Sequence, residues 1–505
     1  MDRRCFINHS AGALLAIGSG ASRSGSELAT MPEGTWFSPE HRQLFLDDAG
    51  IEEMRGLARV LHPPRRHPTN PVLRPDTPWE DRCQVYGTAL FDEERNRFRI
   101  WYLTLPRDRG VRPLDTDGHL RAPHTTLAAY AESADGVHWT KPDLGQFPYD
   151  GDRHNNLLAL GRDNCEGVSV LHDPRDPDPA RRWKCVYWDH GSGGFEIQEG
   201  GKPYCKDGPG DGLCVAFSPE GLQWTPILEN PVLARYCDTG QNLLYDPRLG
   251  KYVVFSRLGF GRKLARSEST DCVHWTEPEL VLECDEADGP GTQIYGAGVD
   301  LYEGLYVAML WVYYEGRDGT IDTQLAVSRD GFAWTRVAER AVWLPLGEPD
   351  SWEGGMVRSC GRIIKRGEEL FIYYCGVHGA HHGPKVAQVE RKHRTAVGLL
   401  TQRRDGFVSL DAGDAPGVLT TKPFAWPGGT LHLNADARDG AVRVALVEPS
   451  GRAMPGLEAS LPWRGDAADA AVRWADETLL PTPSSAVRLR VSLERARLYA
   501  WWVET

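Results

Sequence analysis

The sequence has 505 residues, too many for one ordinary hydrophobic core, so it predicts several modules or a repeat array. Its formal net charge of −13 disfavours nucleic acid as a partner, and no apolar run approaches the roughly 20 residues of a membrane helix. The 54 glycines, 35 prolines and 17 tryptophans favour an all-β chain with many turns.

Residues 1–30 have the composition of an export signal. Arg3 and Arg4 precede Phe6 and Ile7, and a weakly apolar stretch with small residues follows at 11–21. Paired arginines in this setting resemble a twin-arginine signal, so we expect export to the periplasm or the medium. A disordered, cytoplasmic N-terminus is the alternative interpretation. Residues 31–79, rich in proline at 61–76, predict an extended lead-in over the edge of the next domain.

A seven-residue turn signature recurs through residues 80–411. Its copies read SADGVHW at 133–139, SPEGLQW at 218–224, STDCVHW at 269–275, SRDGFAW at 328–334 and, degraded, RRDGFVS at 403–409. Each follows an alternating apolar run typical of a half-buried strand, and the glycine suits the positive φ of a tight hairpin turn. The tryptophan on the returning strand is expected to pack between neighbouring repeats.

Three further strands precede each turn, so the repeat unit is a four-stranded antiparallel sheet. Five such units predict a five-bladed β-propeller, with long insertions at 107–124 and 189–212 rising over one face. After residue 411 the pattern changes to strongly alternating segments separated by glycine and proline turns. Residues 412–505 therefore predict a C-terminal β-sandwich.

Five four-stranded repeats with these turns, followed by a β-sandwich, resemble the five-bladed propeller glycoside hydrolases of families 32 and 43 and their relatives. The resemblance implies cleavage of a glycosidic bond in a poly- or oligosaccharide by carboxylates at the starts of the innermost strands, around a central funnel. One carboxyl must stay protonated while its partner stays ionised, and their separation sets the stereochemical outcome. The Asn-Asp-Pro-Asn and Arg-Asp-Pro signatures of the fructan-cleaving family are absent from these strand starts.

Three of the five predicted innermost strands begin with an acid, and these are the candidate catalytic residues: Glu166, Asp238 and Glu353. The first and fourth blades depart from the pattern, because Tyr86 and Tyr295 stand at their strand starts. Asp238 is the strongest candidate, since it opens a polar cluster that leads into an otherwise apolar strand.

Polar and aromatic residues near the same strand starts are candidates for binding substrate. Gln241 and Asn242 belong to the polar cluster of Asp238. Aromatic rings that could stack on sugars, and polar side chains at the starts of loops, complete the set: Tyr86, Tyr236, Tyr295, Asp189, His190 and His378.

The sequence predicts no cofactor and no metal, because it has no phosphate-binding glycine loop and no Cys-x-x-Cys pair. Most of the 11 cysteines are expected to be isolated buried thiols. Two alternatives to a glycosidase stay open. One is a non-catalytic carbohydrate-binding propeller, and the other is a lyase or sugar phosphorylase on the same scaffold.

Overall fold

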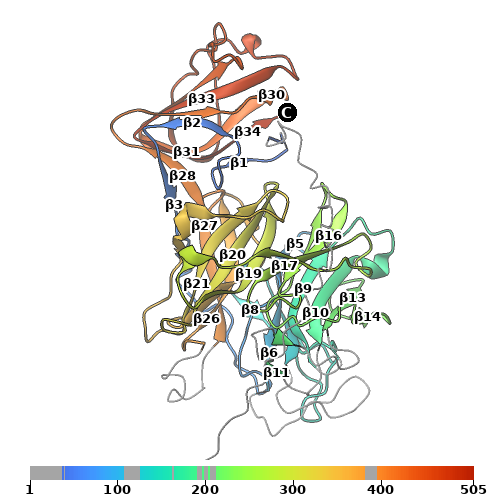
Figure 1. The fold of residues 1–505 in the computed structure, drawn as a ribbon. Helices are drawn as coiled ribbons and strands as arrows, with labels where there is room; N and C mark the ends of the chain where they lie inside the picture. Colours follow the sequence, from blue (N-terminus) through green and yellow to red (C-terminus); the bar gives the residue numbers. More distant parts are fainter. Residues whose placement is uncertain are drawn as a thin grey trace, which may run out of the picture.

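The computed structural model shows two all-β domains placed end to end (Figure 1). It describes residues 37–38, 40–106, 126–161, 164–189, 196–197, 203–204, 212–381 and 395–505. The predicted export signal, His190 and most of the two predicted insertions lie outside these residues. The regular elements described are strands and short 3₁₀ turns, which confirms the predicted all-β class. The 3₁₀ turns are η1 (Pro179–Arg181), η2 (Glu286–Asp288), η3 (Val337–Arg340) and η4 (Glu477–Leu479).

The first three blades are separate four-stranded antiparallel sheets, in the order predicted from the repeats. Blade one contains β5 (Ala89–Asp92), β6 (Arg97–Thr104), β7 (Leu127–Ser133) and β8 (Trp139–Thr140). Blade two contains β9 (Glu166–His172), β10 (Trp183–Asp189), β13 (Gly212–Ser218) and β14 (Thr225–Pro226), with the small pair β11 (Glu196–Ile197) and β12 (Pro203–Tyr204) between β10 and β13. Blade three contains β15 (Asn242–Asp246), β16 (Lys251–Ser256), β17 (Leu264–Ser269) and β18 (Glu279–Leu282).

Blades four and five are joined into one sheet by a single parallel bridge between Ile321 and Met356. Blade four contains β19 (Thr292–Tyr302), β20 (Leu305–Tyr314), β21 (Ile321–Ser328), β22 (Thr335–Arg336) and β23 (Val342–Leu344). Blade five contains β24 (Met356–Ser359), β25 (Ile364–Arg366), β26 (Glu369–Val377) and β27 (Thr395–Arg403), with β4 (Arg65–Arg66) of the lead-in at its outer edge.

Strand β4 closes the ring, because the residues after the degraded fifth turn do not return to blade five. They form β28 (Val408–Ala412), which joins the C-terminal domain instead. The physical difference is at Ser409, where the other turns carry the tryptophan that packs between blades. The lead-in thus supplies a strand of the propeller rather than only covering its edge.

The turn signature forms the same hydrogen bonds in each intact copy. In blade four, the hydroxyl of Ser328 accepts from the amide of Gly331 at 2.8 Å, and Asp330 Oδ1 accepts from the amides of Phe332 and Ala333 at 2.8 and 2.9 Å. The tryptophans pack between blades as predicted. Trp334, for example, meets a blade-three ring, Phe255, edge to face at 5.7 Å.

Blades approach one another closely around the axis, and blades one and five complete the ring. A Cβ atom on Gly87 of blade one would lie 1.5 Å from the carbonyl oxygen of Val168 in blade two, so only glycine fits there. Blades one and five share a buried cluster that includes Val85, Tyr373 and Cys375. The propeller is therefore closed by hydrophobic packing as well as by β4.

The C-terminal domain folds around one long, bent strand, β31 (Thr430–Val447), and is consistent with the predicted β-sandwich. The first half of β31 pairs with β32 and β34, and its second half pairs with β33. Leu433 and Val444, from the two halves, share one buried core. The other strands are β1 (Gln43–Leu44), β2 (Ile51–Arg55), β3 (Ala58–Leu61), β29 (Gly417–Thr421), β30 (Phe424–Ala425), β32 (Trp463–Ala471), β33 (Ala486–Glu494) and β34 (Ala496–Glu504).

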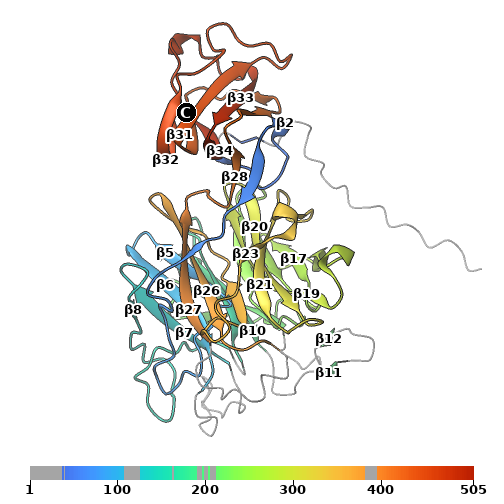
Figure 2. The same cartoon turned by 90° about the vertical axis from the view of Figure 1, so that its left-hand side faces the viewer.

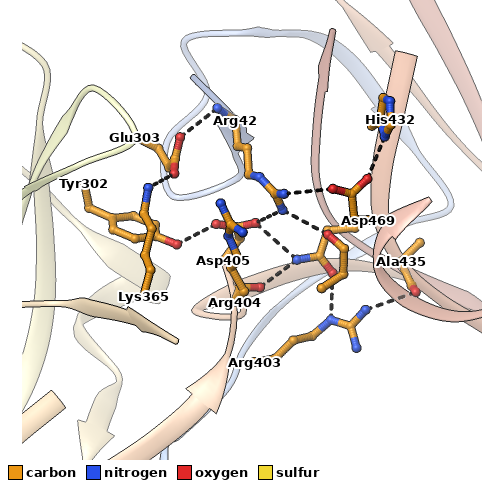
Figure 3. A network of polar contacts seen from close by, with 12 residues as sticks. Arg42, Tyr302, Glu303, Lys365, Arg403, Arg404, Asp405, His432, Ala435 and Asp469 are labelled. Atoms are coloured by element: carbon orange, nitrogen blue, oxygen red, sulfur yellow. Dashed lines mark hydrogen bonds and ion pairs between the residues drawn. The ribbon is translucent and has the colours of Figure 1, made fainter. Parts of the chain in front are cut away.

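A buried polar network joins the two domains at Asp405, the acid of the degraded turn (Figure 3). Asp405 accepts hydrogen bonds from Arg42 of the lead-in at 2.8 Å, Tyr302 of blade four at 2.6 Å and Asn434 of the C-terminal domain at 3.2 Å. Arg42 also donates its backbone amide to Glu303. The carboxylate thus connects the lead-in, the propeller and the C-terminal domain.

Candidate active site in the propeller funnel

The candidate site lies on the face of the propeller turned away from the C-terminal domain (Figure 2). Innermost strands begin on this face and second strands end there, because the two are antiparallel. The other ends of β19 and β20 carry the turn at Tyr302 and Glu303, which contacts the domain interface. The strand starts chosen from the sequence therefore surround the end of the axis that is free of the C-terminal domain.

The axis is closed by an aromatic floor. Trp311, on the second strand of blade four, passes over Gly296, where a Cβ atom would lie 2.8 Å from its ring. Its indole stacks on Tyr86 with centroids 5.2 Å apart and donates to the carbonyl of Ser359 at 3.0 Å. Tyr295 belongs to the same buried cluster. Because residues of blades one, four and five meet here, we call Tyr86, Trp311 and Tyr295 the funnel floor.

Only one of the two carboxylate oxygens of Asp238 is bonded to other side chains. Its Oδ2 accepts from the hydroxyl of Tyr236 at 2.6 Å and from Nη1 of Arg257 at 3.3 Å. Nε and Nη2 of Arg257 donate to the carbonyl of Tyr295 at 3.2 and 2.8 Å, which fixes the guanidinium. The Asp238 side chain is 32% exposed, and within the described ranges its Oδ1 has no hydrogen-bond partner. The carboxylate is therefore oriented toward a ligand.

Glu166 and Asp238 both influence the pKa of Tyr295. Burial is the main cause that raises the pKa of Tyr295 to about 12, and the charge of Asp238 is the next. Arg257 and Arg262 lower this pKa, whereas Glu166 raises it further. Two carboxylates from adjacent blades are thus within electrostatic reach of one tyrosine.

Sequence reasoning missed two arginines near this tyrosine. Arg257 directly follows the apolar strand β16, and Arg262 bonds to His381 Nε2 at 3.1 Å and to Gln293 at 2.8 Å. His381 in turn lies edge-on to Tyr295 at 4.8 Å. A signal for Arg257 existed, since a charged residue at the end of a buried second strand must lie on the same face as the strand starts.

Gln241 and Asn242 are buried and bonded to the backbone rather than directed at a ligand. Nδ2 of Asn242 donates to the carbonyl of Ala297 at 2.9 Å, and its Oδ1 accepts from the amide of Val299 at 2.9 Å. Nε2 of Gln241 donates to the carbonyl of Cys237 at 2.7 Å. Asn242 thus holds the start of β15 against blade four, whereas Oε1 of Gln241 is buried without a hydrogen-bond partner among the described residues. Their predicted binding role stays a prediction.

Glu353, the third candidate acid, has hydrogen-bond partners on both carboxylate oxygens. Its Oε1 accepts from Nε of Arg66 at 2.9 Å and its Oε2 from the hydroxyl of Tyr374 at 2.7 Å. These partners belong to the lead-in strand and to the second strand of blade five. Both carboxylate oxygens of Glu353 are therefore occupied within the protein, and its predicted catalytic role stays a prediction.

The other candidates lie at separate points of the same face. The carboxylate of Asp189 accepts from the amide of Asn164 at 3.0 Å, next to Glu166. Tyr236 holds Asp238, and Tyr86 belongs to the floor. Nδ1 of His378 bonds to the carbonyl of Ser351 at 2.8 Å on the rim of blade five.

Within the described ranges, no three His, Cys, Asp or Glu side chains cluster as a metal site would require, and no helix is long and apolar enough to cross a membrane. Each cysteine in that part of the chain is a free thiol.

No protein-family model and no curated protein matches this sequence. Similar solved structures include a glycosyl hydrolase from Bacteroides ovatus, with 16% identity, a TM-score of 0.44 and coverage of 67% of this chain and 94% of the other. The β-1,2-mannobiose phosphorylase from Listeria innocua has 13% identity, a TM-score of 0.46 and coverage of 67% and 96%. The exo-inulinase from Aspergillus awamori has 13% identity, a TM-score of 0.42 and coverage of 87% and 99%. Likeness of this degree leaves the function to be argued from the side chains of the site.

Proposed function

We propose that the protein is a glycoside hydrolase that cleaves a glycosidic bond of a poly- or oligosaccharide with Asp238 and Glu166. The observation that carries this proposal is the geometry of Asp238. One carboxylate oxygen is held by Arg257 and Tyr236, and the other has no hydrogen-bond partner among the described residues. Glu166, a second acid, is within electrostatic reach of the Tyr295 that supports Arg257. A pair of carboxyl groups around one bond is what glycoside hydrolysis requires.

The roles follow from the different neighbours of the two acids. Asp238, beside the guanidinium of Arg257, acts as the ionised partner that activates water or attacks the anomeric carbon. Glu166 then donates its proton to the leaving oxygen. The hydroxyl of Tyr295, whose pKa is raised to about 12, stays protonated at neutral pH and can donate a hydrogen bond to the substrate.

Release of reducing sugar from a panel of neutral and anionic glycans tests the proposal. We expect Asp238→Asn to lower kcat by about 10²- to 10⁴-fold, because it removes a group that acts on the reacting atoms. Glu166→Gln should lose activity on natural glycosides but retain it on aryl glycosides with a good leaving group, which needs no protonation. Asp318→Asn is the matched control, since this acid lies on the same face and bonds within its own turn.

A glycan that binds to the wild-type protein without being cleaved would contradict the proposal. The protein would then be a carbohydrate-binding propeller, the alternative that the absence of an acid at the start of blade one supports. If Asp318→Asn lost as much activity as Asp238→Asn, the catalytic role assigned to Asp238 would also be contradicted.

Export by the twin-arginine-like segment is part of the same proposal, supported by the composition of residues 1–30. Replacing Arg3 and Arg4 together by lysine should retain the protein inside the cell, as measured by fractionation. A distribution equal to that of the wild type would show that export does not depend on these arginines and would contradict a twin-arginine signal.

A further inference from the structure

A buried arginine without an acidic partner stands beside the funnel floor. Arg358, on β24, is only 4% exposed. Its Nη1 donates to the hydroxyl of Tyr86, and its Cζ lies 4.7 Å from the centroid of that ring. Its Nε is buried without a hydrogen-bond partner, and no carboxylate in the described part of the chain lies within ion-pair distance.

The fold gains little from a cation in this position. An unpaired charge is costly to bury, and the contact with the Tyr86 ring offsets part of the cost while satisfying no donor. Burial lowers the pKa of Arg358 to about 10, so the side chain is still a cation at neutral pH. A buried polar group left without a partner requires an explanation, and a ligand that completes its hydrogen bonds provides one.

A second cation, Arg82, reinforces the same region. Its charge lowers the pKa of Arg358, which places the two guanidinium groups within electrostatic reach. Arg82 is 3.3 Å from Asp81, and its Nε is also buried without a partner. The local balance is therefore two cations against one carboxylate. The backbone around Arg82 is fixed between blades five and one, where the amide of Cys83 donates to the carbonyl of Thr395 at 2.9 Å.

The two arginines and the acid pair stand on different walls above one floor. Tyr86, which contacts Arg358, stacks on Trp311, and Trp311 shares its cluster with Tyr295. Tyr295 in turn supports Arg257 and, through it, Asp238. Arg358 is therefore linked to Asp238 through the aromatic residues of the funnel floor.

We propose that Arg358, with Arg82 and the hydroxyl of Tyr86, forms a subsite for an oxyanion, so that the funnel takes an acidic glycan. A guanidinium matches the paired oxygens of a uronate carboxylate or a sulfate ester. A free phosphate ion offers the same chemistry. The identity of the ligand as a glycan rests on the proposed function, whereas the subsite itself rests on the arginines.

Binding of matched oligosaccharides tests the subsite without requiring cleavage. Calorimetric titration would compare a uronate-containing oligosaccharide with its methyl ester, in Asp238→Asn and in Asp238→Asn/Arg358→Met. We expect the acid to bind at least about tenfold more tightly than the ester, and this ratio to fall toward one when Arg358 is replaced. Arg366→Met, an exposed arginine of the same blade, should leave the ratio unchanged. A preference that survives Arg358→Met would overturn the proposal.

Thermal unfolding separates a binding role from a structural one. Because the substitution removes an unpaired buried charge, Arg358→Met without ligand should melt at the same temperature as the wild type or higher. A marked fall in Tm would make Arg358 a structural residue and overturn the subsite. Arg358→Lys keeps the charge and should retain part of the preference for the acid.

Titration with inorganic phosphate distinguishes a free phosphate ion from an anionic group carried by a glycan. Phosphate that binds wild type but not Arg358→Met, and that is needed for release of sugar, would support the subsite and assign it to a free co-substrate. A protein that prefers the uronate to its ester but cleaves no glycan would support the anion subsite and contradict the proposed hydrolase activity. A protein that cleaves glycans but has no preference for the uronate would support the hydrolase activity and contradict the anion subsite.

Discussion

At the scale of single residues, Asp238 and Glu353 show that hydrogen-bond partners decide whether a carboxylate is available to a ligand. Both were chosen because they open an innermost strand. Asp238 shares Arg257 with the backbone of Tyr295 and leaves one oxygen open, whereas both oxygens of Glu353 are occupied by Arg66 and Tyr374. The first arrangement is suited to a ligand and the second to structure.

Asp322 permits a prediction of pH dependence at the same scale. It is 8% exposed, and burial raises its pKa from 3.8 to about 6, although the hydroxyl of Tyr314 opposes this. Because the folded pKa lies above the unfolded one, its contribution to stability is full below about pH 4 and falls as the pH rises to about 6. Asp322→Asn should therefore stabilise the fold at pH 7 by on the order of 2 kcal/mol and change little at pH 4. Melting curves at both pH values check this, and an equal effect at both would contradict it.

At the scale of elements, the turn signature is a local device that the chain uses repeatedly. Ser328 and Asp330 satisfy backbone amides of the tight turn, and Trp334 packs against the preceding blade. In blade two a glutamate, Glu220, does the same, accepting from the amide of Gln223 at 2.6 Å. In the degraded copy Asp405 binds groups outside its own turn.

Replacing Asp330 by alanine should destabilise the protein by about 1–2 kcal/mol, because two amides lose their acceptor. Burial raises the pKa of Asp330, but hydrogen bonds from Phe332 and Ala333 outweigh it and lower the pKa overall. The stabilisation is thus present above about pH 4 and lost as the pH falls. Denaturant unfolding measures the effect, and Asp330→Asn, which keeps one acceptor oxygen, should lose less. If Asp330→Ala destabilised the protein by the same amount at acid pH, the stabilisation would not depend on the negative charge of Asp330.

At the scale of the whole molecule, the lead-in joins the two domains. It supplies β4 to blade five and β1, β2 and β3 to the C-terminal domain, and Arg42 reaches the buried Asp405 between them. Ring closure and domain docking therefore depend on the same segment. This arrangement predicts that the two domains unfold together.

Asp405→Ala tests that coupling. Removing one partner of a buried ion pair should cost about 3–5 kcal/mol and separate the unfolding of the two domains into two calorimetric transitions. Asp469→Ala is the control, because this partner of Arg42 is 54% exposed and should change stability by less than about 1 kcal/mol. A single unshifted transition in Asp405→Ala would show that the interface does not depend on this network.

The sequence by itself determined the strands, the turns, the number of repeats and the position of Asp238. These features depend on alternation and on hydrogen bonds within a few residues, such as Ser328 with Asp330, so they can be read locally. Only the tertiary structure decided which side chains become partners. Glu353 meets Arg66, 287 positions away, and Arg358 is buried without an acid, because ring closure brings distant segments together. Such contacts depend on closure of the whole ring, so no local sequence pattern predicts them.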